Sequence, residues 1–102
     1  MEREEINLKT LEKLGLIAIG ETVRHYRRVV RNISMEKLAE EADISPDHLG
    51  RIERAEKSPH YTTMFKICSA LELDMNDINK RIHELVHEHK DEIEAEREAD
   101  NQ

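Results

Sequence analysis

Apolar residues recur at helical spacing along most of the chain. In residues 17–33 they lie four, three and four positions apart, at Ile19, Val23, Tyr26 and Val30. In residues 62–73 the same kind of spacing joins Met64, Ile67, Cys68 and Leu71. Since residues three and four apart share one face of an α-helix, both segments are predicted to be helices that bury this face.

Two shorter helices are predicted between these segments. Ser34 is a favourable N-cap for a helix over residues 35–42, which should end at Asp43. The pair Ser45-Pro46 predicts the start of another helix, because serine caps well and proline at the first helical position loses no hydrogen bond. This helix, over residues 46–55, should stop before the turn at Pro59.

Both ends of the chain are also predicted to be helical. Residues 2–15 have leucines every three positions, and Gly15 is expected to end that helix. It could pack on the main domain, form a dimer contact or be a disordered arm. A last helix begins near Met75, and its seam of heptad spacing is apolar only in its first half: Met75, Ile78, Ile82, Leu85, His89 and Glu92.

Composition supports an all-α fold. Glycine and proline together number five, and only 3% of residues are aromatic. A β-sandwich or barrel would need more turns and more aromatic and β-branched residues. We predict five helices with an N-terminal helical extension (1–16), a central domain (17–78), and an extended C-terminal helix with an acidic tail (79–102).

Charge is distributed unevenly. The net charge is −7, and residues 61–102 alone carry five basic and eleven acidic side chains. This net charge does not by itself suggest nucleic acid as a partner, although a local basic stripe can still bind it. The one cysteine, Cys68, lies in an apolar pattern and is expected to be buried. Without a long apolar run or a secretory signal, the chain is expected to be cytoplasmic, with no membrane partner.

Residues 83–87 read HELVH, the five-residue signature of zinc peptidases. His83 and His87 would lie on one helical face, and Glu84 could act as general base. A peptidase also needs a third ligand and a cleft, and the acidic residues after His87 offer carboxylates such as Asp91 or Glu94 but no wall. We therefore expect no enzyme, no catalytic residue, no cofactor and no metal; a non-catalytic metal site shared by two subunits is the alternative.

The middle of the chain resembles a known family. If Met35 is the first position, the apolar residues suit two short helices packed across a tight turn: Leu38, Ala42, Ile44, Leu49 and Ile52. Ala39 lies where the helices would cross. The stretch from Ile33 to Ile78 is similar to the Cro/phage-repressor helix-turn-helix family, also called the Xre family, including its Arg-Ile-Glu and its Lys-Ile-x-x-Ala-Leu.

Three residues and one length depart from this family's pattern. Asp43 stands where a turn glycine is most frequent, Ala55 follows Arg54 where glycine is usual, and Met35 replaces a glutamine that helps to anchor DNA. The link between the first two helices of the domain is also one residue longer than is common.

The resemblance implies that the helix over residues 46–55 enters the major groove of double-stranded DNA. Leu49 and Ile52 point to the core in a helical projection, so other residues of this helix are the candidates for contact with base edges: Pro46, Asp47, His48, Gly50, Arg51 and Arg54. Arg51 is the best candidate for a bidentate contact to guanine. Gly50 would let the DNA approach the backbone closely, or be a tolerated surface glycine.

Phosphate contacts are expected from a second set of residues: Ser34, Arg28, Arg31 and Lys57. The arginine stripe could instead be a solvated helix face. One arginine, either Arg27 or Arg28, should pair with Glu53 as in the family.

The family resemblance implies a sequence-specific regulator of transcription, commonly a repressor, that binds two half-sites as a homodimer. The seam of the last helix offers a dimer contact, and the acidic tail should point away from DNA or bind a protein partner. The alternative is the antitoxin of a toxin–antitoxin pair, in which DNA binding is autoregulatory.

Overall fold

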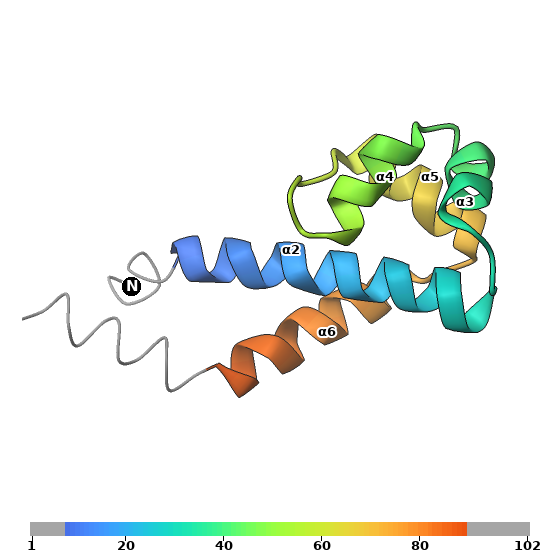
Figure 1. The fold of residues 1–102 in the computed structure, drawn as a ribbon. Coiled ribbons are helices and arrows are strands. Elements are labelled where there is room, and N and C mark those ends of the chain that lie inside the picture. Colours follow the sequence, from blue (N-terminus) through green and yellow to red (C-terminus); the bar gives the residue numbers. More distant parts are fainter. Residues whose placement is uncertain (1–7, 90–102) are drawn as a thin grey trace, which may run out of the picture.

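The computed structural model describes residues 8–89, and this part of the chain contains helices and no strands. The helices are α2 (Leu8–His25), α3 (Met35–Ala42), α4 (Pro46–Glu53), α5 (Tyr61–Leu71) and α6 (Met75–Glu88), with a π-helical segment η1 (Tyr26–Val30) after α2. Figure 1 shows α3, α4 and α5 grouped at one end, with α2 and α6 extending together away from them. The all-α, five-helix fold is confirmed.

Helix α2 joins the predicted N-terminal extension to the domain without a break. The prediction that Gly15 ends a separate helix was wrong, because α2 continues from Leu8 to His25. Leu14 and Ala18 are buried against Leu85 of α6 on either side of this glycine. Packing of that face outweighs the cost of about 1 kcal/mol of an internal glycine. The boundary predicted between residues 16 and 17 therefore falls inside one helix.

The main core joins α2, α3, α4, α5 and the start of α6. Its largest fully buried side chains are Leu38, Leu49, Ile52, Ile67, Leu71 and Val23. Ala39, expected at the crossing of two helices, is 1% exposed. Cys68 is buried as predicted, and desolvation raises the pKa of its thiol. The apolar pattern thus predicted the buried faces of the three short helices.

The π-helical segment changes which side of the chain faces inward after Tyr26. Val30 was predicted to face the core, but it is 58% exposed, whereas Arg27 is buried. A π turn holds more residues than an α turn, so it shifts the following side chains around the axis. We attribute the segment to the extra residue that the sequence shows in this link.

Side chains cap three helices, and two of the three caps are the serines that the sequence predicted. The Ser34 hydroxyl accepts a hydrogen bond from the Lys37 amide at 3.0 Å, and the Ser45 hydroxyl accepts one from the His48 amide at 3.0 Å. Asp74 caps α6 through the Asn76 amide. Asp43, which stands where the family most often has a turn glycine, adopts the left-handed conformation with φ 56° and ψ 51°. The turn between α3 and α4 therefore forms without glycine.

Ala55 also has a left-handed backbone, with φ 60°. A residue with a Cβ atom is destabilised by about 1–2 kcal/mol in this region, and glycine avoids this cost. Glycine also lowers stability by about 0.5–1 kcal/mol, because it loses more conformational freedom on folding. We expect Ala55→Gly to raise the free energy of unfolding by about 0.5–1 kcal/mol in urea denaturation. Ala70→Gly, inside α5, is the control and should lower it by about 1 kcal/mol. A loss of stability in both variants would contradict strain at Ala55.

Candidate nucleic-acid interface

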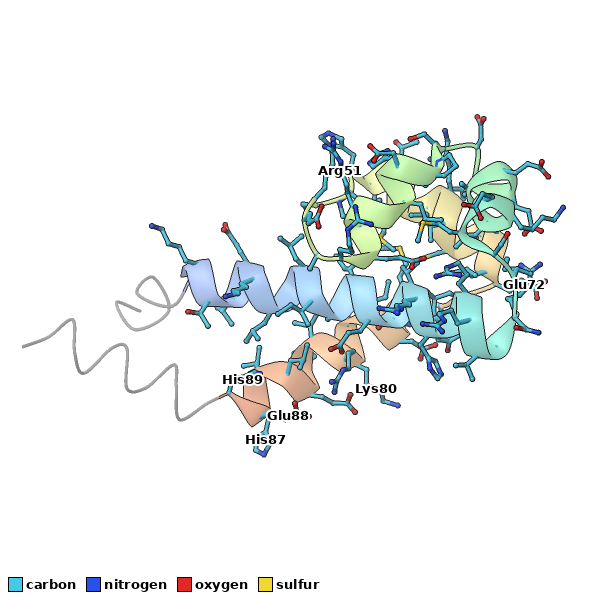
Figure 2. All side chains as sticks on the ribbon, viewed as in Figure 1. Arg51, Glu72, Lys80, His87, Glu88 and His89 are labelled. Carbon is cyan, nitrogen blue, oxygen red and sulfur yellow. The ribbon has the colours of Figure 1, made fainter. Side chains whose placement is uncertain are left out.

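Helix α4 has one face in the core and one face in solvent. Leu49 and Ile52 are fully buried, and the side chains of Asp47 and Arg51 are 76% and 55% exposed. Figure 2 shows Arg51 projecting from the outer edge of the group formed by α3, α4 and α5. The structure therefore presents Asp47 and Arg51 outward, as the helical projection required.

Asp47 and Arg51 form an ion pair one turn apart, with 3.3 Å between the Asp47 carboxylate and Nε of Arg51. An exposed pair with this spacing is worth only about 0.3–0.5 kcal/mol. The Arg51 guanidinium can therefore exchange this partner for another acceptor at little cost.

Gly50 is buried, which differs from the open position expected of it. A Cβ atom built there would lie 2.9 Å from Nη1 of Arg54 and 3.4 Å from Sδ of Met35. The space that the missing side chain leaves is filled by these two residues. A molecule that approaches this face of α4 would therefore contact the Arg54 guanidinium before it reached the backbone at Gly50.

His48 and Pro46 differ in what they present. Pro46 is exposed at the start of α4, whereas His48 is half-buried. Nε2 of His48 is buried and has no hydrogen-bond partner among the residues described. This nitrogen is turned away from solvent, so it is not presented to a base edge in this conformation.

The predicted phosphate contacts fall into two groups. Ser34, Arg28 and Lys57 are exposed, and the two cations make no hydrogen bond or ion pair within residues 8–89. Arg31 is instead engaged: it pairs with Glu41 at 3.3 Å and donates a hydrogen bond to the Ala70 carbonyl. Its position thus ties the end of η1 to α3 and α5, a structural role that the sequence did not predict.

Arg27 is the arginine that pairs with Glu53, which resolves the alternative that the sequence left open. Its Nε and Nη2 donate to the two Glu53 carboxylate oxygens at 2.7 and 2.9 Å, and Nη1 donates to the Ile33 carbonyl at 3.1 Å. The hydrogen bond to the Glu53 carboxylate raises the pKa of Arg27. Arg28 remains exposed. This bidentate pair links η1 to the last residue of α4 and so fixes how α4 is held.

A tight turn at Asp43, a short helix on each side of it, and an outward polar face on the second helix are the geometry of a helix-turn-helix. The helix-turn-helix family model matches residues 23–78. The chain belongs to the helix-turn-helix family. This family is one of DNA-binding domains that regulate transcription, and it includes the Cro type that the sequence was predicted to resemble. No curated protein and no solved structure matches the chain.

The HELVH motif lies beyond the residues that the family model matches, and the structure can be compared with the zinc-site alternative directly. His83 and His87 are exposed on α6, while Leu85 between them is buried in the contact with α2. Residues 8–89 contain no group of three side chains that could hold a metal ion. The carboxylates proposed as a third ligand, Asp91 and Glu94, lie outside the described residues, as does the acidic tail.

None of the helices between residues 8 and 89 is both long and apolar enough to cross a bilayer.

Proposed function

We propose that this helix-turn-helix protein is a sequence-specific repressor that inserts α4 into the major groove of DNA as a homodimer. The observation that carries the proposal is the outward face of α4, where Asp47 and Arg51 are exposed beside a fully buried inner face. In this class of motif the second helix reads base edges from its N-terminal part, and Asp47 and Arg51 lie in its first two turns.

The proposed interface would make two kinds of contact with DNA, one to base edges and one to phosphates. Arg51 can donate two hydrogen bonds to a guanine edge once it leaves Asp47. Arg28, Lys57 and the Ser34 hydroxyl would contact phosphates and set the register without reading sequence. The start of α3, where backbone amides are uncapped apart from Lys37, also favours a phosphate beside Ser34.

The seam predicted as a dimer contact packs within the chain instead, because Ile78 lies in the main core and Leu85 packs on α2. The proposed dimer would therefore form beside the seam, through the partly buried edge of α6 and the first half of α2. These helices pack together through a small cluster of Leu14, Ala18 and Leu85, and Ile17 and Val86 at its edge are only partly buried. A second copy covering this edge would enlarge the cluster and place two α4 helices on one DNA duplex. The antitoxin alternative stays a prediction, because the acidic residues that would bind a toxin follow residue 89.

Arg51→Ala tests the reading face. We expect the affinity for an operator selected from random DNA to fall about 10- to 100-fold, because a bidentate guanine contact is worth about 1–3 kcal/mol. Affinity for unrelated DNA should change little. Fluorescence anisotropy at fixed salt measures both values.

Lys80→Ala is the matched control, since it also removes one exposed cation. Lys80 lies on α6, far from Arg51 in Figure 2. If Arg51→Ala and Lys80→Ala bind the operator as tightly as the unmodified chain does, the assignment of α4 as the reading helix is wrong.

A further inference from the structure

Arg54 follows the last turn of α4, yet its guanidinium lies one turn back along that helix. It is the C-cap residue, and Nη1 lies 2.9 Å from where Gly50 would carry a Cβ atom. Helical side chains lean toward the N-terminus, so residue 54 reaches over residue 50. This direction brings a residue from the far end of α4 toward the part of the helix that carries Arg51.

Glu56 holds the guanidinium in this place. Its carboxylate accepts from Nε of Arg54 at 2.9 Å and lies 3.5 Å from Nη2. These hydrogen bonds raise the pKa of Arg54 and lower the pKa of Glu56. Both side chains are about half exposed, so the pair lies at the surface and open to DNA.

The backbone after α4 fixes where Glu56 lies. The left-handed conformation of Ala55 turns the chain back, and the Glu56 amide donates to the Arg51 carbonyl at 2.8 Å. Glu56 is thereby anchored to the helix that carries both arginines. Its pair with Arg54 has two hydrogen bonds, the shorter of 2.9 Å, whereas Asp47 and Arg51 make a single contact of 3.3 Å. Together with the space that Gly50 leaves, this pair favours one place for the Arg54 guanidinium.

We propose that Glu56 is a specificity-determining residue that does not itself contact DNA but positions Arg54 as a second base-reading arginine beside Arg51. This inference rests on the proposed function. A guanidinium held in one orientation can meet a base edge in a fixed geometry, whereas an unrestrained arginine also reaches phosphates, which carry no sequence information. The Glu56 carboxylate additionally repels phosphates, which weakens binding to unrelated DNA.

Glu56→Gln tests the proposal, because glutamine keeps the size of the side chain and removes its charge. We expect the ratio of operator affinity to unrelated-DNA affinity to fall about tenfold, chiefly because unrelated DNA binds more tightly. The dependence on salt should steepen by about one released counterion. Base preferences, measured position by position on a randomised operator, should relax at the same base pairs that Arg54→Ala relaxes and persist where Arg51 reads.

Glu72→Gln is the matched control. It makes the same chemical change at an exposed residue after α5, which lies apart from Arg51 in Figure 2. We expect its affinity ratio and base preferences to match those of the unmodified chain. The Nε–H resonance of Arg54 in NMR spectra should broaden or shift in Glu56→Gln and stay unchanged in Glu72→Gln.

Gly50→Ala provides a second route to the same result. The added methyl group would displace the Arg54 guanidinium while Glu56 remains, so base preference should relax at the positions of Arg54. If Glu56→Gln and Gly50→Ala both keep the affinity ratio of the unmodified chain, the inference about Glu56 is wrong although the proposed function stands. If the unmodified chain prefers no DNA sequence, both the proposed function and this inference are wrong.

Discussion

Glu53→Ala is expected to lower the free energy of unfolding by about 3–5 kcal/mol, the largest loss that we predict for one side chain. The Glu53 and Arg27 side chains are only 3% and 11% exposed, so the substitution leaves a guanidinium with little access to water and without its carboxylate. Small domains unfold with about 5–15 kcal/mol, so this loss would remove a large fraction of the stability of the domain. Urea denaturation followed by circular dichroism measures the change.

Two further variants separate loss of the charge pair from loss of packing. Glu40→Ala removes an exposed partner of Lys37 and should cost no more than about 0.5 kcal/mol. The double substitution Arg27→Met with Glu53→Leu should recover most of the loss, because it removes both buried charges and keeps apolar volume. A single Glu53→Ala that is as stable as Glu40→Ala would show that the pair does not hold α4.

Gly20→Ala is expected to lower the free energy of unfolding by about 2–3 kcal/mol, despite the better helix propensity of alanine. Gly20 is the point where α2 meets α4. An added Cβ atom would lie 2.6 Å from the Glu53 carbonyl oxygen and 2.8 Å from that of Ile52. Both are backbone atoms, so no side chain can turn aside and α4 must shift as a whole.

Gly15→Ala, in the same helix, is the matched control. No atom lies within 4 Å of its Cβ position, so only the helix propensity changes, and stability should rise by about 1 kcal/mol. Opposite signs for the two substitutions in thermal or urea denaturation would confirm the close approach at Gly20. Equal effects would contradict it.

The sequence predicted those parts of the fold that depend on local chemistry. The Ser45-Pro46 pair fixes the start of α4. The buried faces of α3, α4 and α5 follow from apolar residues spaced three and four positions apart. Asp43 stands where the family most often has a turn glycine, and its left-handed backbone agrees with that position, since Asp tolerates positive φ better than most residues. These signals act within one or two turns of helix, so they can be read without knowing the neighbours.

The features that the sequence did not predict depend on contacts between distant residues. Gly15 continues a helix because α6 covers its flanks, and Val30 faces solvent because the π turn brings Arg27 to Glu53. At the interface, the outward position of Arg51 followed from the projection of α4. The covering of Gly50 did not, since it requires the direction of the Arg54 side chain and the turn at Ala55.

The unbroken course of α2 has a consequence for the proposed dimer. Its 18 residues span about 27 Å as one rod, from the contact with α6 to the segment that carries Arg27. Such a rod has no hinge between the proposed dimer contact and the segment that holds the DNA-binding helix α4. In the proposed dimer, the distance between the two DNA-binding helices would thus be fixed by the protein. Operators with a base pair added or removed at their centre would then bind poorly.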